Sequence, residues 1–341
     1  MAETPFTKAT GIKYPIICGA MYPCSNPELV AAASAAGAMA IVQPVSLVFV
    51  HKQKFRDGLR QILDRTQYPI GLNLLVEKSS RTYQERNREW MGIALEEGVR
   101  FFITALGNPS WVVDQVHKQG GLVYHDVTEK KWAMKALDCG VDGLICVNNR
   151  AGGHAGQQAP EKLLADLKGF GKPLICAGGV GSPEEFRQAI DMGYDGVQMG
   201  TRFIATKECT AHEDYKRAIL KAKEKDIVLT DKISGVPVSV IKTPYISAIG
   251  TKAGPLSRML LKNSRTKHYM RMFYTLKSIW QLKQSYSKGN NYKEYYQAGK
   301  SVEHISALES AETVVKRFGE AWANPAATTE ASPAASAESS S

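Results

Sequence analysis

A histidine set among glycines is the first feature of this sequence that could do chemistry. The stretch VNNRAGGHAG, residues 147–156, places His154 among Gly152, Gly153 and Gly156, directly after an apolar run. An unperturbed imidazole titrates near neutral pH, which suits a side chain that takes up and releases protons. Glycines let a flat ligand lie against the backbone beside the ring. We therefore predict that His154 is catalytic; a histidine hydrogen-bonded within its loop is the alternative.

Two further glycine-containing stretches, CAGGVGSPEE and VQMGTRF, carry donors that suit a phosphate group. In the first, Gly178 and Gly179 have no Cβ, so their backbone N–H groups can approach an anion closely. Ser182 then opens a helix whose N-terminus attracts negative charge. In the second, Gly200 and Thr201 offer an amide and a hydroxyl. These residues predict a phosphate cup, unless the glycines serve only to turn the chain.

Other polar or small residues interrupt apolar runs and are candidates for ligand contact. The corner GAM at 19–21 could line a planar ring with backbone and a soft side chain. Asn73, within the run GLNLL, either meets a ligand or pairs with backbone. His125 and Asp126 end a further run and are candidates of the same kind.

Eight apolar runs of strand length alternate with stretches of helical spacing between Tyr14 and Phe203. The runs lie at 14–21, 38–43, 68–75, 100–107, 122–127, 143–149, 173–179 and 196–203. Continuous apolar strands that alternate with helices are typical of parallel strands covered on the outside. Eight such units predict a closed (β/α)8 TIM barrel. In that fold ligands bind at the C-terminal ends of the strands, and a phosphate commonly sits beyond strands 7 and 8.

The alternation stops after Phe203, which divides the predicted chain into three parts. Residues 1–225 are predicted as the barrel, with HEDYKRAILKAKEKD at 212–226 as its eighth helix. Residues 226–325 are predicted as a mainly helical C-terminal addition packed on the barrel, with an extended stretch over 227–250. Residues 326–341 are small, polar and Pro-containing, and predict a disordered tail.

The basic charge of the chain belongs to one segment. Eleven Lys and Arg residues and a single acid lie between 250 and 300, and this excess equals the net charge of +10. The aromatic residues of the segment are Tyr269, Phe273, Tyr274, Trp280, Tyr286 and Tyr292. A binding module for anionic lipid or nucleic acid is one interpretation. A solvated helical face on the barrel is the other, and the absence of a nucleic-acid motif favours it.

The cysteine pattern and the hydropathy of the chain indicate the cellular compartment in which the protein works. The 6 cysteines form no CxxC pair, and Cys18, Cys146 and Cys176 fall in apolar runs. This pattern predicts buried thiols rather than disulfides or a zinc site, so no metal site is expected. The N-terminus lacks the apolar core of a signal peptide, and no run approaches membrane-spanning length. We expect a cytoplasmic protein.

Taken together, five motifs resemble one known family. PIICGAM, GLNLL, AGGHAG, ICAGG and GVQMGTRF occur in the order and spacing of the nitronate monooxygenase (2-nitropropane dioxygenase) family. The resemblance runs from about residue 11 to 206, with a weaker match in YYQAGKSVEHI. Members of that family are FMN-dependent (β/α)8 enzymes.

The resemblance implies a role for each matching residue. His154 would be the catalytic histidine, acting as base toward neutral nitroalkanes or as polar partner of a nitronate anion. The flavin would oxidise the nitronate, and O2 would complete its conversion to a carbonyl compound and nitrite. The residues implied to bind FMN are Gly19, Ala20, Met21, Asn73, Gly152, Ala177, Gly178, Gly179, Gly200 and Thr201.

The sequence departs from these relatives where the substrate is concerned. Arg150 stands where relatives commonly carry a glutamate, and AGAMAIVQPVS stands where they carry a Gly-Gly-Leu-Gly type segment. Some relatives carry a lysine near the position of Asp126. An arginine could hold an anionic substrate or a nicotinamide dinucleotide phosphate. Arg150, His125 and Asp126 are therefore the predicted substrate residues.

The same barrel and glycine-flanked histidine also resemble other flavoenzymes. In flavin-dependent enoyl-acyl-carrier-protein reductases and NAD(P)H:quinone reductases, NAD(P)H reduces the flavin, which passes a hydride onward. The basic 250–300 segment would steer an acidic acyl carrier protein in that alternative. An assembly of identical subunits is compatible with either function.

Overall fold

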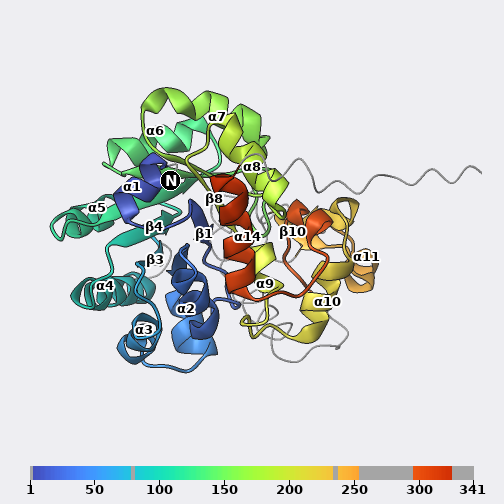
Figure 1. Cartoon of the computed structure of the whole chain (residues 1–341), viewed down its shortest axis with the longest axis horizontal. Helices are drawn as coiled ribbons and strands as arrows, with labels where there is room; N and C mark the ends of the chain where they lie inside the picture. The colour runs from blue at the N-terminus through green and yellow to red at the C-terminus, as the bar shows by residue number, and fades with distance from the viewer. Residues whose placement is uncertain (1–2, 78–80, 233–236, 253–294, 325–341) are drawn as a thin grey trace, which may run out of the picture.

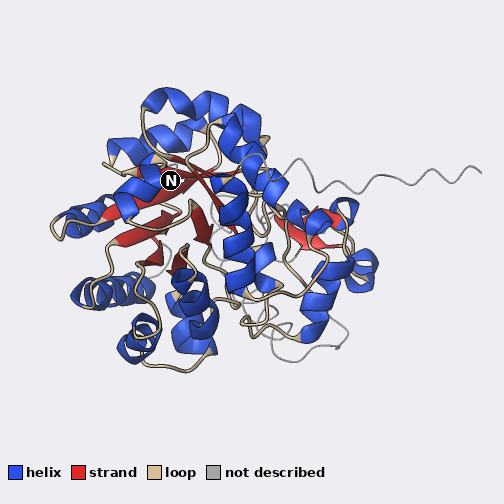
Figure 2. Ribbon diagram, in the orientation of Figure 1, coloured by secondary structure: helices blue, strands red, loops and turns tan. Residues whose placement is uncertain are grey.

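Eight parallel strands form a closed barrel at the centre of the molecule (Figure 1, Figure 2). The computed structural model describes residues 3–77, 81–232, 237–252 and 295–324. The strands pair in chain order, which confirms the predicted (β/α)8 architecture. They are β1 (Ile16–Cys18), β2 (Met39–Val42), β3 (Ile70–Leu75), β4 (Phe101–Ala105), β5 (Leu122–Val127), β6 (Gly143–Val147), β7 (Leu174–Ala177) and β8 (Gly196–Met199).

Helices surround the strands in an outer layer. Three of them begin at a proline, which fits the first turn because its N–H would have no intrahelical acceptor there. The helices that follow the first seven strands are α2 (Pro27–Ala35), α3 (Phe55–Leu63), α4 (Arg81–Glu96), α5 (Ser110–His117), α6 (Lys130–Asp138), α7 (Pro160–Leu167) and α8 (Pro183–Met192).

Side chains alternate along each strand between the barrel interior and the helical layer. Apolar side chains such as Ile17 fill the interior, and Phe6 of α1 (Pro5–Thr10) closes its N-terminal end. The Phe6 ring centroid lies 5.7 Å from that of Phe101 and 5.6 Å from that of Tyr124. Because the N-terminal end is packed solid, a ligand site belongs at the opposite, C-terminal end.

The thiols predicted to be buried are buried. Cys18, Cys146 and Cys176 lie in the core between strands and helices. All six cysteines are free. Among the described residues, no group of three or more His, Cys, Asp or Glu side chains could hold a metal ion. None of the helices that these residues form is long and apolar enough to cross a membrane.

The helix that completes the outer layer comes from the far end of the chain. Helix α14 (Ala311–Ala323) packs between α8 and α2, and the ring centroids of Phe318 and Phe186 lie 6.0 Å apart (Figure 1). A Cβ on Gly319 would lie 2.3 Å from the ring of Tyr14, so only glycine permits this close packing. The prediction that 212–226 forms the eighth helix is therefore wrong, because a long insertion separates β8 from α14.

Helix α10 (Glu213–Lys221) belongs to that insertion instead. Its Tyr215 stacks on Tyr296, with ring centroids 4.8 Å apart. The insertion continues as an antiparallel hairpin of β9 (Ile227–Thr230) and β10 (Val238–Ile241), followed by α11 (Pro244–Ile249). The extended stretch predicted over 227–250 is confirmed for the hairpin, whereas 244–249 is helical.

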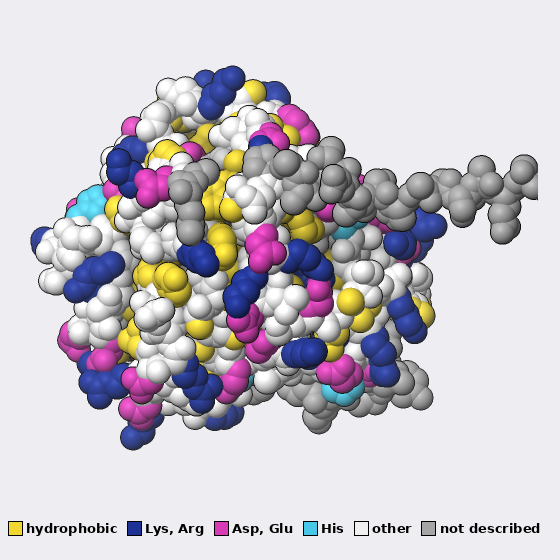
Figure 3. Space-filling model, viewed as in Figure 1, with side chains coloured by type: hydrophobic (Ala, Val, Ile, Leu, Met, Phe, Trp, Pro, Cys, Tyr) yellow, Lys and Arg dark blue, Asp and Glu magenta, His cyan; other side chains and the backbone are white. Residues whose placement is uncertain are grey.

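Most of the basic segment lies outside the described residues. This holds for 253–294, including its six aromatic side chains, and for the predicted tail at 326–341. The helical and partner predictions made for them stay predictions. Over the face shown in Figure 3, the described Lys and Arg side chains are interspersed with Asp and Glu.

Candidate active site at the C-terminal mouth of the barrel

The parallel strands bring nearly all predicted site residues to one end of the barrel. Residues 19–21 follow β1, Asn73 lies in β3, and His154 stands in the loop after β6. Neighbouring strand ends are joined directly, since the Gly19 N–H donates to the Met199 carbonyl at 3.0 Å. A Cβ on Gly200 would lie 3.5 Å from the Met21 sulfur, so the ends of β1 and β8 pack together.

The two predicted residues of β5 face opposite ways. Asp126 lies two residues after Tyr124 and therefore faces the same side of the strand, the barrel interior. His125 lies between them and faces the other side of the strand, toward the helices, where its Nδ1 is 2.8 Å from the Thr104 hydroxyl. Burial lowers the pKa of His125 to about 4. The structure therefore does not bring His125 to the mouth, and its hydrogen bond to Thr104 is structural.

Two buried acceptors inside the barrel have no partner. Among the described residues, none is hydrogen-bonded to Asp126 Oδ1 or to Gln198 Oε1, although both atoms are shielded from solvent. Burial raises the pKa of Asp126 to about 7. Buried polar atoms are nearly always hydrogen-bonded, so two unpartnered polar atoms at a barrel mouth indicate a polar ligand or bound water. Sequence reasoning missed Gln198, although, like Asn73, it is a polar residue in an apolar run.

The His154 loop is held by the insertion. The Gly153 N–H donates to the Ser239 carbonyl at 3.3 Å, and the Ser239 N–H donates back at 2.7 Å. His154 itself is exposed in the described structure. Desolvation by the surrounding protein nevertheless lowers the pKa of the imidazole, and the negative charge of Glu77 acts in the opposite direction. At neutral pH the ring is therefore uncharged and able to accept a proton.

The glycine pair after β7 is required by its backbone and by its neighbours. Gly178 and Gly179 have φ angles of 121° and 87°, which other residues rarely adopt. A Cβ on Gly178 would lie 2.5 Å from the Asn148 side-chain oxygen, and one on Gly179 would lie 2.4 Å from Arg150 Nε. The pair thus turns the chain tightly beneath the β6 loop, which is the structural role that the sequence left open for these glycines.

Free donors remain at the ends of β7 and β8. Among the described residues, none accepts a hydrogen bond from the backbone N–H of Gly179 or Thr201. The Thr201 hydroxyl accepts one from the Gly299 N–H at 3.0 Å and keeps its own proton to donate. Ser182 caps α8 as predicted, with its hydroxyl accepting from the Glu185 N–H at 3.2 Å. These donors fit an anionic group such as the FMN phosphate.

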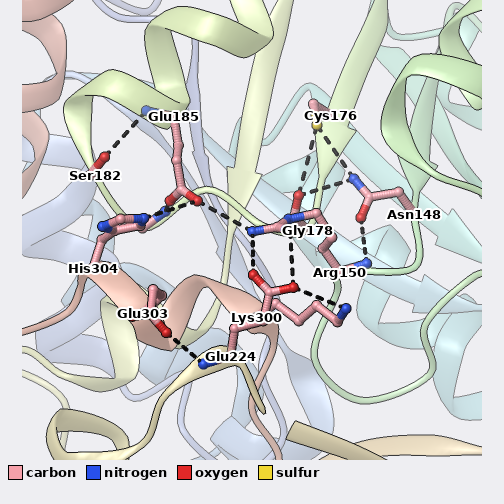
Figure 4. A network of polar contacts seen from close by, with 11 residues as sticks. Asn148, Arg150, Cys176, Gly178, Ser182, Glu185, Glu224, Lys300, Glu303 and His304 are labelled. Atoms are coloured by element: carbon pink, nitrogen blue, oxygen red, sulfur yellow. Dashed lines mark hydrogen bonds and ion pairs between the residues drawn. The ribbon is translucent and has the colours of Figure 1, made fainter.

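Arg150 is engaged by two carboxylates (Figure 4). Its guanidinium lies 3.4 Å from Glu185 and 3.1 Å from Glu224. Lys300 also contacts Glu224, at 3.1 Å, and His304 lies 3.7 Å from Glu185. The predicted substrate residue therefore ties the β6 loop to α8 and to the insertion, and two carboxylates already balance its charge.

Asn148 is a residue that sequence reasoning missed. It is fully buried, its side-chain N–H donates to the Gly178 carbonyl at 3.0 Å, and its oxygen accepts from the Arg150 N–H at 2.8 Å. These bonds join the loops after β6 and β7, and so position the glycines on both. Its position directly after an apolar run could have indicated this role, because an asparagine at a strand end can form hydrogen bonds with backbone groups of the adjoining loops.

Comparison with known proteins supports a common origin with flavoenzymes. The model of the family described as nitronate monooxygenase matches residues 3–320. A probable nitronate monooxygenase of Staphylococcus saprophyticus is 24% identical, over 92% of this chain and 98% of that protein. The (3aS,4S,5R,7aS)-5-hydroxy-7a-methyl-1-oxo-octahydro-1H-indene-4-carboxyl-CoA dehydrogenase of Mycobacterium tuberculosis is 26% identical, over 72% of this chain and 68% of that one.

Solved structures share the whole fold. FabK from Thermotoga maritima superposes with a TM-score of 0.77 at 22% identity, covering 96% of this chain and 99% of that one. Nitroalkane oxidase from Streptomyces ansochromogenes superposes with a TM-score of 0.71 at 19% identity, covering 95% and 99%. The insertion and α14 are therefore compatible with a fold already seen along nearly the whole chain.

Proposed function

Because the chain belongs to the nitronate monooxygenase family, and is thus a flavin-dependent oxidoreductase, we propose that it oxidises alkyl nitronates with O2 to a carbonyl compound and nitrite. One observation carries the proposal. The glycine-flanked His154 loop, the glycine pair after β7 and the Gly200–Thr201 corner meet at one end of the barrel. The two glycine-containing corners would bind the phosphate of a planar cofactor, and the His154 loop would exchange a proton with the substrate.

The described residues fit FMN as the cofactor. Gly179 and Thr201 supply free N–H donors for the phosphate, while residues 19–21 and Asn73 offer backbone and polar contacts to the ring system. Gln198 adds an acceptor without a partner in the described structure. Bound FMN supplies the redox chemistry, because it takes up electrons that no side chain of the chain can accept.

His154 and its supports carry the protein's part of the reaction. A neutral imidazole takes a proton from the carbon of a nitroalkane, or donates its N–H to an oxygen of a nitronate. Its lowered pKa keeps it neutral at pH 7. Gly153, bonded to Ser239, fixes the loop on one side, and Asn148 fixes its base on the other. Such positioning is what makes proton transfer efficient.

Reduction of a thioester-linked substrate by NAD(P)H is the second candidate. The observation that favours a thioester-linked substrate is that the Mycobacterium tuberculosis relative, 26% identical, is named as a dehydrogenase of a CoA ester; the direction of electron transfer in this candidate rests on the resemblance to flavin-dependent reductases. Arg150 gives no added support for NADP binding, since two carboxylates already engage it. An acidic acyl carrier protein remains the predicted partner of the basic segment in this candidate.

Anaerobic absorbance spectroscopy on the flavin-loaded protein separates the two candidates. Loss of the oxidised flavin bands after addition of an alkyl nitronate alone is the expected result. Rapid bleaching by NADPH or NADH, with no response to the nitronate, would instead make the protein a reductase. A protein that binds no FMN would contradict both.

A further inference from the structure

Asp126 is an ionisable group in the barrel interior that the proposed function leaves without a task. It lies near the C-terminal end of β5, and its inward neighbour on the same strand, Tyr124, packs in the apolar interior. The facing register partner on β6 is Ile145, which is fully buried. Its Oδ1 has no hydrogen-bond partner in the described part of the chain. Asp126 as a whole is partly exposed, but its shielded oxygen loses hydration without gaining a hydrogen bond, which disfavours the charged form.

The other strand-associated aspartates show how this fold normally satisfies such a group. Asp142, just before β6, accepts from the Val123 N–H at 2.8 Å and lies 2.9 Å from His117 Nε2. Asp195, just before β8, accepts from the Leu174 N–H at 2.8 Å. Both lie at the N-terminal end of the barrel, where residues serve stability. Asp126 alone of the three lies toward the ligand end, and it alone has an unpaired, shielded oxygen.

Within the part of the chain that the structure describes, no charged group compensates Asp126 from inside the barrel. The other polar side chains on the strands toward this end of the barrel, such as those of Asn73 and Gln198, carry no charge. Burial is the cause that raises the pKa of Asp126, with no contribution from a charged neighbour. The titratable groups on β5 and on the elements packed against it are Tyr124, His125, Cys146, Asp114, His117, Lys130, Lys131, Lys135 and Asp138, and those at the mouth are Glu77 and His154.

We propose that Asp126 contacts the flavin as a neutral carboxylic acid, so that filling the barrel mouth takes up one proton from solvent. A ligand that covers the mouth excludes the water that would otherwise solvate the carboxylate. The ring system of a flavin carries carbonyl and nitrogen acceptors, to which only the protonated acid can donate a hydrogen bond. The inference rests on the proposed flavin site and assigns Asp126 a binding role there.

The sign of the pH dependence follows from linkage. Because the complex holds one more proton than the free partners, the FMN dissociation constant rises with pH once free Asp126 is ionised. The effect is at most about tenfold per pH unit. Two groups at the site do not add to this dependence between pH 7.5 and 9: the FMN phosphate is already a dianion, and the pKa of His154 lies below its usual value. Likewise, burial holds the pKa of Tyr124 above its usual value.

Titration of the full-length apoprotein with FMN between pH 7.5 and 9 tests the inference, combined with calorimetry in two buffers of different ionisation enthalpy. The expected results are a dissociation constant that rises several-fold per pH unit and an uptake of about one proton per FMN. Asp126→Asn, which is neutral at every pH, should bind FMN with a flat profile. Asp142→Asn is the matched control and should behave as wild type.

Each outcome of this experiment either supports or overturns the role of Asp126. A flat wild-type profile with no proton uptake would overturn the role of Asp126 while leaving the flavin site intact. A pH dependence that persists in Asp126→Asn would do the same. The wild-type proton count is valid even if that variant fails to fold. Absence of FMN binding at every pH would overturn the proposed function, and the inference with it.

Discussion

Gly153 and Ser239 exchange two backbone hydrogen bonds, at 3.3 and 2.7 Å, although 85 positions separate them in the chain. One belongs to the loop that carries His154, and the other to the hairpin strand β10. The insertion after β8 is therefore part of the active-site architecture. A residue with no chemistry of its own, Ser239, positions the catalytic loop through its backbone.

Ser239→Pro should impair turnover more than flavin binding. Proline removes the N–H that donates to the Gly153 carbonyl, so the His154 loop loses one of its two bonds to β10. We expect kcat to fall at least about tenfold, with the FMN dissociation constant changed less. Steady-state kinetics and FMN fluorescence quenching measure the two quantities. Ser239→Ala keeps both backbone bonds and should match wild type; equal losses in both variants would contradict the argument.

His154→Asn should retain FMN and lose turnover. Asparagine keeps a hydrogen-bonding side chain but cannot accept a proton near neutral pH, so the rate with a neutral nitroalkane should fall about 10²- to 10⁴-fold. In wild type, kcat/KM for the nitroalkane should fall as pH drops through the lowered pKa of His154, because the imidazolium cannot act as base. The control is His117→Asn, at the other end of the barrel. Normal turnover of His154→Asn would make the histidine structural.

Gly178→Ala should weaken both the fold and the flavin site. The new Cβ would lie 2.5 Å from the Asn148 oxygen and from the Ala151 nitrogen, at a φ of 121°. We expect a loss of about 1 to 3 kcal/mol in the free energy of unfolding and at least about tenfold weaker FMN binding. Gly92→Ala is the matched control: its Cβ meets nothing within 4 Å, and alanine favours the α4 helix. Unaltered FMN affinity in Gly178→Ala would argue against a phosphate beside this turn.

Arg150→Ala should destabilise the protein in a pH-dependent way. Without the guanidinium, Glu185 and Glu224 each lose a cationic partner, and we expect a loss of about 1 to 2 kcal/mol at pH 8. Burial raises the pKa of Glu185 above its usual value, so this side chain becomes neutral as pH falls and the deficit should shrink by pH 5. Thermal unfolding at both pH values measures this.

Arg187→Ala serves as the comparison for Arg150, because its ion pair with Asp191 lies on the surface of α8. Such a pair contributes at most about 1 kcal/mol. A raised KM for Arg150→Ala with unchanged stability would show that the guanidinium binds substrate after all.

The barrel itself could be predicted from the sequence because its signals are local. Eight apolar runs separated by helical stretches specify parallel strands covered by helices, and a closed sheet brings all C-terminal strand ends together. The glycine motifs around His154, Gly178 and Gly200 follow strands 6, 7 and 8, so their meeting at one mouth also followed from the chain order.

Which side of a strand faces inward could not be predicted. Strands of a barrel are buried on both faces, so the run LVYHDV has no polar alternation that separates the two sides. His125 and Asp126 therefore looked equivalent in sequence. Only the closed barrel turns one toward the helices, where Thr104 binds it, and the other toward the interior, where nothing among the described residues does.

The remaining surprises are contacts between distant parts of the chain. Helix α14 rather than α10 completes the helical layer, because Phe318 packs on Phe186 of α8. The two residues are far apart in the sequence, with the whole insertion between β8 and α14. Arg150 likewise acquires Glu185 and Glu224 from α8 and from the insertion. Periodicity and spacing thus determined the elements and the location of the site. Long-range packing, which no local pattern encodes, decided which side chains are free to act there.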